Sequence, residues 1–440
     1  MRWSSAIMSS GKGGGKNDQA WEAIFLRYQV LEAVERQGSF RISADQIREY
    51  REPRLMAKFD HRANLPQIFA QHRLAILPVS RGDYLIAPFE AYRTFEEPAA
   101  QVQRFSLPAS LESLDAGYIP SEAIALNCAL AAGILGDFLG EDRLTPTVSG
   151  RMHSDSFSFQ IETAAGGLLP VEVDRSQIEI DAALEGARSL ALLEAKRDLA
   201  EDFLVRQLYY PFRAWNGRVH KRVRPVFLVY SNGIFRLYEY EFTDPGRYNS
   251  LRLVQQKNYS LEDTSFTQRD LLDALEAARP EPEPPVTFPQ ANRFDRVVNL
   301  CELLQAQELT PEEVTAAYDF NSRQTSYYTA AGRYLGLLEK DGPRFRLTEE
   351  GRRLMALGYR KRQAALCGLI LRHQPFRELL RFALREGRPP AAEEAAALMA
   401  PMELRGVGSR ATLLRRASTA ARWVGWMLGL TAACGGQLSF

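Results

Sequence analysis

Cysteines, histidines and long apolar runs are scarce in this chain of 440 residues, and each scarcity argues against a class of protein. The cysteines are scattered in mostly apolar contexts, which argues against a disulfide framework and predicts reduced thiols in an intracellular protein; they are Cys128, Cys301, Cys367 and Cys434. The five histidines form no cluster with them, so no zinc site is indicated. No apolar run is long enough to span a membrane and no signal peptide is visible, so we expect a cytoplasmic protein with no membrane partner.

Charge is balanced over the whole chain but not along it. The sequence holds 55 Lys and Arg against 54 Asp and Glu, a formal net charge of +1. Residues 351–440 carry fifteen basic and five acidic side chains, a net of +10, which leaves −9 for residues 1–350. A basic C-terminal fifth indicates a surface for a polyanion, with an ordinary solvated helical surface as the alternative.

Two short apolar segments, residues 178–181 and 190–196, carry the charged side chains of most interest. Each is short enough to be a strand, and an antiparallel pairing of the two brings Asp181 close to Glu194. Because side chains alternate along a strand, Glu194 and Lys196 project from the same side. Two carboxylates and a lysine at a strand end can hold Mg²⁺ and activate water beside a phosphate. A structural ion pair at a sheet edge is the alternative.

Asp181, twelve further residues and then Glu194-Ala195-Lys196 resemble the signature of the PD-(D/E)xK nuclease superfamily, which includes most type II restriction endonucleases. Ile180 stands where the strict signature has proline. The resemblance implies a mixed α/β, restriction-endonuclease-like core. In it, Asp181, Glu194 and the carbonyl of Ala195 hold one or two Mg²⁺, and Lys196 orients the attacking water. It also implies 5′-phosphate products and a cognate methyltransferase encoded nearby but not bound.

The segments around the signature predict the order of that core, which is helix, three strands, helix and strand. Residues 121–139 are predicted as the first helix, residues 156–161 as the first strand and residues 225–230 as the last. An amphipathic helix is predicted over residues 199–215, with Gln207 on the border of its apolar stripe. Members of the superfamily often carry a glutamine there that touches the site, so Gln207 is either a catalytic residue or an ordinary polar position.

Glu122 opens the first predicted helix, where some members supply a further metal ligand. A carboxylate also suits a helix N-terminus electrostatically, and we favour that simpler role for Glu122.

The N-terminal part predicts a DNA-binding module. Residues 1–16 are rich in Ser, Gly and Lys and are predicted to be disordered. Residues 17–100 contain three predicted helices followed by a hairpin, the order of a winged helix-turn-helix. Within them, residues 51–61 resemble a segment of certain restriction endonucleases. The DNA contacts expected from this module are Arg54, Lys58, Arg62, Asn64, Gln67 and Arg81.

A proline-rich linker at residues 279–291 is predicted to separate the core, residues 101–278, from the C-terminal part. Residues 292–360 repeat the order of helices and wing, and residues 361–440 predict a basic helical module. Arg, Gln, Asn and Ser at the start of a third helix are the side chains that contact base edges and phosphates. The expected DNA contacts are Asn321, Ser322, Arg323, Gln324, Thr325, Tyr327, Arg344, Arg410, Arg415 and Arg416. A winged helix used only for protein contact is the alternative.

Together these patterns predict a type II restriction enzyme that hydrolyses double-stranded DNA sequence-specifically with Mg²⁺. A homodimer is the economical expectation, since cutting both strands needs two centres. Two alternatives stay open, a DNA-binding regulator that keeps the fold without catalysis and a repair or structure-specific nuclease. The presence of all three signature residues argues against the regulator.

Overall fold

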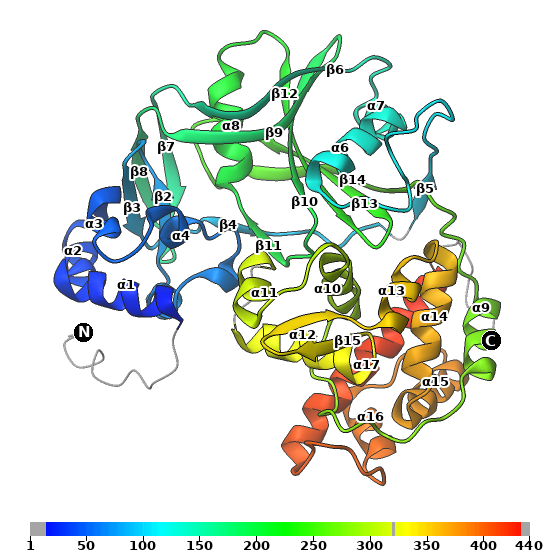
Figure 1. Ribbon diagram of the computed structural model, residues 1–440. Helices are drawn as coiled ribbons and strands as arrows, with labels where there is room; N and C mark the ends of the chain where they lie inside the picture. The colour runs from blue at the N-terminus through cyan, green and yellow to red at the C-terminus, as the bar shows by residue number, and fades with distance from the viewer. Residues whose placement is uncertain (1–14, 100, 319–321, 433–440) are drawn as a thin grey trace.

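The computed structural model describes residues 15–99, 101–318 and 322–432 (Figure 1). It is a mixed α/β structure in which a central mixed sheet is followed by a helical C-terminal region. None of the described helices is long and apolar enough to cross a membrane.

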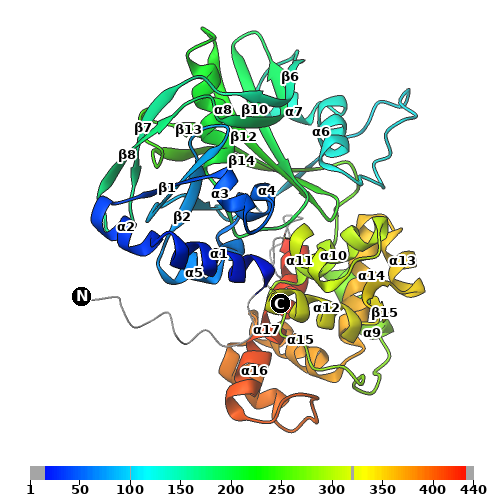
Figure 2. The same ribbon diagram turned by 60° about the vertical axis from the view of Figure 1, so that its left-hand side comes forward.

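The N-terminal part combines short helices with a three-stranded sheet of order β1-β3-β2 (Figure 2). Its core is aromatic, because Phe69 packs edge-on against Trp21 and Phe25 with ring centroids 4.8 and 5.1 Å apart. The elements are α1 (Lys16–Arg27), α2 (Val30–Gln37), β1 (Phe40–Ser43), α3 (Ala44–Arg48), α4 (Pro53–Ala57), the 3₁₀ turn η1 (Arg62–Asn64), α5 (Gln67–Gln71), β2 (Ala75–Pro78) and β3 (Asp83–Ala87).

The central sheet has seven strands and is mixed, with β10 parallel to β12 and antiparallel to β9. Alternate residues of β10 pack on opposite faces. Leu190 and Leu192 join the apolar cluster of α8 (Arg206–Asn216), whereas Ala191 and Leu193 join that of α6 (Glu122–Ala131) and α7 (Ile134–Leu139). In spatial order the strands are β5 (Val102–Arg104), β14 (Leu251–Ser260), β13 (Ile234–Phe242), β12 (Arg222–Ser231), β10 (Ser189–Lys196), β9 (Gln177–Glu185) and β6 (Thr145–His153).

Two sequence-based expectations for the core are wrong in detail. The segment predicted as its first strand is β7 (Phe157–Glu162), which pairs with β8 (Leu168–Val173) in a separate sheet, and β6 takes the expected place beside β9. The helix predicted from residue 199 begins only at Arg206. Before it, β11 (Asp202–Leu204) pairs with β4 (Tyr92–Thr94), so the apolar side chains there are buried in extended backbone.

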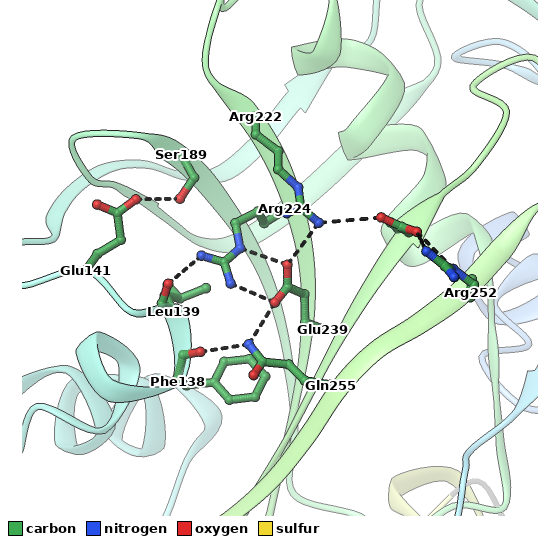
Figure 3. A network of polar contacts seen from close by, with 10 residues as sticks. Phe138, Leu139, Glu141, Ser189, Arg222, Arg224, Glu239, Arg252 and Gln255 are labelled. Carbon is green, nitrogen blue, oxygen red and sulfur yellow. Dashed lines mark hydrogen bonds and ion pairs between the residues drawn. The ribbon is translucent and has the colours of Figure 1, made fainter.

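A buried ion pair ties α7 to interior strands of the sheet (Figure 3). Arg224 on β12 donates twice to Glu239 on β13, at 2.8 and 2.7 Å, and its third nitrogen donates to the carbonyl of Leu139 at 2.6 Å. Gln255 on β14 bridges Glu239 and the carbonyl of Phe138, both at 2.8 Å. The Glu239 side chain is only 1% exposed, so each of its partners compensates a desolvated charge.

The C-terminal region is built on one apolar cluster that begins before the proline-rich segment. Phe266, Leu271 and Ala274, at and beside α9, share that cluster with the helices that follow. The region contains α9 (Gln268–Ala277), α10 (Phe294–Ala306), α11 (Pro311–Ala317), α12 (Ser322–Tyr334), β15 (Leu338–Asp341), β16 (Arg344–Leu347), α13 (Glu349–Met355), α14 (Tyr359–Leu371), α15 (Gln374–Glu386), α16 (Ala392–Met399) and α17 (Arg410–Ala432).

The proline-rich segment contains no helix or strand, yet it is held along the C-terminal helices. The amide of Glu281 donates to the carbonyl of Arg372 at 2.9 Å, and the Tyr334 hydroxyl donates to Glu283 at 2.6 Å. Phe288 is buried in the C-terminal cluster. The segment therefore packs as part of the C-terminal region.

A buried carboxylate joins this region to the central sheet. Glu302 on α10 accepts from the Ser231 hydroxyl at 2.8 Å, the Asn232 amide at 2.7 Å and the Asn299 amide group at 2.9 Å. Asn232 and Gly233 have φ of +51° and +74°, the left-handed conformations that a two-residue hairpin turn requires. The tip of the β12–β13 hairpin is thus fixed against α10.

Candidate active site

The three signature residues converge at the end of β10. The antiparallel register ends with the pair of Ala182 and Leu193, and Asp181 and Glu194 are the next residues beyond that pair on the two strands. Opposed residues of an antiparallel pair share a face of the sheet. The backbone amide of Ala195 donates to the Asp181 carboxylate at 2.8 Å, and the Lys196 ammonium lies 2.7 Å from Glu194. Glu194 and Lys196 therefore project from the same side of the strand, as expected from the sequence.

Gln207 reaches the same carboxylate from the first turn of α8. Its side-chain amide donates to Glu194 Oε1 at 2.8 Å, the oxygen that also accepts from Lys196. Glu194 Oε2 is engaged by neither donor. Although α8 begins later than the sequence predicts, the contact expected of Gln207 is present.

Burial sets the electrostatics of this cluster. Burial is the main cause that raises the pKa of Glu194, to about 7, and the negative charges of Asp181 and Asp60 add to it. The positive charge of Lys196 lowers this pKa. Burial by itself lowers the pKa of Lys196, but Glu194, Asp60 and Glu122 outweigh it and raise that pKa well above its ordinary value. Lys196 is therefore a permanently charged ammonium at the strand end.

Glu122 lies close enough to interact with this group. Its pKa is raised by burial and by the nearby charges of Asp181 and Asp198, and lowered by Lys196. Glu122 at the start of α6 therefore lies within electrostatic range of the signature residues, in addition to its place at a helix N-terminus.

Three residues near the signature were missed by the sequence analysis as part of the site. Asp60 and His61 belong to the N-terminal part and are 5% and 4% exposed. His61 Nε2 lies 3.3 Å from Asp198 Oδ2, in the loop after β10. Burial would raise the pKa of Asp198, but the hydrogen bond and charge of His61, with Lys196, hold it below its ordinary value. The signal was the Asp-His pair at the end of residues 51–61, which the sequence analysis assigned to DNA contact.

A cavity of about 260 Å³ lies beside the cluster, between the start of α6, the loop after β10 and the helices α10 and α11. Figure 1 shows α10 and α11 on the side of the sheet where β10 ends. The lining of the cavity includes two nearby carboxylates, Glu122 and Asp198. It also includes Asn299 and Tyr318 from the C-terminal region. Asp181, Glu194 and Lys196 are not part of this lining, so the cavity lies next to the strand end and does not reach into it.

The donor atoms fit Mg²⁺ in kind. Asp181, Glu194 and the carbonyl of Ala195 offer only oxygen, the ligand that this cation prefers. Glu194 keeps one oxygen clear of both Lys196 and Gln207. Within the described residues, no group of three or more His, Cys, Asp or Glu side chains could hold a metal ion, so the fit depends on two carboxylates and a backbone carbonyl.

In the N-terminal part, some of the residues expected to contact DNA are exposed, and others form ion pairs or are buried. Arg54, Gln67 and Arg81 are exposed, and Lys58 is exposed beside Asp60 at 3.4 Å. Arg62 is also exposed but pairs with Glu90 at 3.5 Å and with Asp202 at 3.9 Å. Asn64 has a buried side-chain amide, so its role as a surface contact is not supported.

In the C-terminal region, two expected DNA contacts are buried. Thr325 is 2% exposed and shares a hydrogen bond of 2.7 Å with Thr315, so it faces α11, not the surface. Arg416 is 9% exposed, and burial lowers its pKa. Asn321 and the side chain of Ser322 lie outside the described residues. The other expected contacts are at least partly exposed; they are Arg323, Gln324, Tyr327, Arg344, Arg410 and Arg415.

Three family models match parts of the chain. Each is described as a domain of unknown function: DUF6996 over residues 18–86, DUF6997 over residues 87–260 and DUF7226 over residues 296–432. The signature and Gln207 lie in the second match, whereas Asp60 and His61 lie in the first. No curated protein and no solved structure matches the chain.

Proposed function

We propose that the protein is a Mg²⁺-dependent DNA endonuclease of the type II restriction class, with a PD-(D/E)xK core between winged-helix modules. The observation that carries the proposal is the convergence of Asp181, Glu194 and Lys196 at the end of a buried strand. Gln207 adds a fourth side chain from the helix that follows. An accidental ion pair at a sheet edge does not account for that set, because β10 lies in the interior of the sheet.

In this proposal Asp181, Glu194 and the carbonyl of Ala195 hold the metal. Bound Mg²⁺ supplies Lewis-acid polarisation of the phosphate and a lowered pKa for a water molecule. Lys196, as a permanent ammonium, orients the attacking water and offsets negative charge that grows on the phosphorus oxygens in the transition state. Gln207 holds Glu194 in place through its amide.

Double-stranded DNA is the partner that the remaining features support. The N-terminal sheet and the β15–β16 hairpin are two wings that follow short helices, and exposed arginines lie beside both of them, including Arg54, Arg81, Arg323 and Arg344. The net charge of +10 over residues 351–440 favours a phosphate backbone. Since one chain carries one such centre, a homodimer cutting both strands is the simplest assembly.

Digestion of plasmid and phage DNA with Mg²⁺ tests the proposal. Discrete bands support a restriction enzyme, smearing supports a repair or structure-specific nuclease, and no cutting with Mg²⁺ or Mn²⁺ supports a non-catalytic regulator. Sequencing the ends of any discrete fragments gives the recognition site and checks for 5′-phosphates.

A further inference from the structure

A short stretch of the N-terminal part, residues 58–62, lies between α4 and η1 and extends to the loop that follows β10. Its preceding helix is anchored in the N-terminal core, because Trp21 Nε1 donates to the carbonyl of Met56 at 2.9 Å. Phe59 is buried in the same core. The stretch is therefore a rigid extension of the N-terminal domain.

Four contacts join this stretch to residues 198–204, which follow soon after the signature. The amide of Leu204 donates to the carbonyl of Asp60 at 2.9 Å. The amide of Arg62 donates to Asp202 at 3.1 Å. His61 Nε2 faces Asp198 at 3.3 Å, and its other ring nitrogen contacts the carbonyl of Asp202.

Asp60 is 5% exposed, and its carboxylate pairs with Lys58 at 3.4 Å. The Lys58 side chain is 61% exposed, so this pair is weakly held. The negative charge of Asp60 raises the pKa of both Lys196 and Glu194.

We infer that His61 is a positioning residue of the candidate nuclease centre, so that the centre is completed by the N-terminal domain. His61 contacts Asp198 and the carbonyl of Asp202, and these contacts fix the loop leaving β10. The inference rests on the proposed function. DNA held by the N-terminal domain then acts on the same stretch that orders the centre, which couples recognition to cleavage.

Steady-state cleavage by H61A and H61Q tests this inference, with H153A as a matched control at an exposed position. Gln can place an amide donor near the position of His61 Nε2, so H61Q should regain activity that H61A lacks. We expect H61A to lower kcat at least about tenfold, while KM and the affinity for DNA in Ca²⁺ change less than about twofold. H61Q should lie within a few-fold of the unaltered protein.

A second measurement does not depend on catalysis. Hydrogen exchange of the amides in residues 197–204, without metal or DNA, should accelerate in H61A and stay near that of the unaltered protein in H61Q and H153A. Equal kcat in all variants, or equal exchange of this loop, would overturn the inference. If H61A loses activity, H61Q does not regain that activity and the Tm is lowered, then His61 is merely structural. That result would also overturn the inference. If the unaltered protein does not cleave DNA, the proposed function itself has failed.

Discussion

The backbone amide of Ala195 donates to the carboxylate of Asp181, although the two residues are fourteen positions apart in the chain. This contact ties the Asp181 side chain to the neighbouring strand next to Glu194 in the chain. In the proposed function, removing either carboxylate takes away a metal ligand, while the apolar β9–β10 pairs from Ala182 and Leu193 onward remain.

Asp181→Ala and Lys196→Ala should each abolish cleavage, with a loss of at least about a hundredfold, because each removes charge that acts on the reacting phosphate. DNA affinity in Ca²⁺, measured by gel shift, should be nearly unchanged. Asp142→Ala, an exposed substitution outside the cluster, is the control. Wild-type cleavage rates in either site variant would show that the site is elsewhere.

Gln207→Ala should weaken the centre without destroying it. Gln207 only orients Glu194, so we expect a loss of about 10–100-fold in activity or in apparent Mg²⁺ affinity. A Mg²⁺ titration of the cleavage rate separates the two effects. An unchanged titration curve would reduce Gln207 to an ordinary polar residue.

Glu239→Ala should cost about 3 kcal/mol or more in the free energy of unfolding, because Arg224 would be left buried without its partner. Glu241→Ala removes an exposed pair with Arg252 and should cost about 1 kcal/mol at most. Urea unfolding at neutral pH measures both. Similar values for the two variants would contradict the strong role of the buried pair.

The same pair predicts how stability depends on pH. Burial would raise the pKa of Glu239, but Arg224, Gln255 and Arg222 hold it below its ordinary value of 4.5. The stabilisation is therefore complete above that value and lost as the pH falls through the lower folded-state pKa. In urea titrations below pH 4.5, the difference between the unaltered protein and Glu239→Ala should shrink; a constant difference would exclude this linkage.

Arg323→Ala should weaken DNA binding or relax its specificity, because Arg323 is an exposed cation on α12, where its guanidinium contacts the Tyr327 hydroxyl at 2.5 Å. Loss of one phosphate contact lowers the slope of log affinity against log salt by about one, whereas loss of a base contact relaxes the site. Arg269→Ala on α9 is the control. Identical salt slopes and cleavage patterns would remove α12 from the DNA interface.

The centre of the fold was predictable because its signals are local. The apolar segment at residues 190–196 predicted a strand, and that prediction is confirmed. β6 was missed because its side chains are mostly exposed and its pairing is interrupted by irregularities near Pro146 and Gly150, so it lacks an alternating pattern.

The remaining errors concern long-range packing, which a local pattern does not encode. Leu199 and Phe203 fit a helical stripe equally well, but pairing with β4 drew their segment into an extended conformation. The sequence predicted Thr325 and Arg416 at the surface, but Thr325 is buried against α11 and Arg416 is buried in the C-terminal region. Asp60 and His61 are at least 120 residues away from the signature, so only the tertiary fold brings them there.

The carboxylate of Glu302 fixes the C-terminal region relative to the central sheet. Pulling α10 away from the hairpin at Ser231 and Asn232 would leave a buried charge without two of its three donors, so the C-terminal region cannot swing on a hinge at that junction. If the proposed function holds, any base bound by α12 or α17 should lie a constant number of steps from the scissile bond, and the cut should fall at one defined offset.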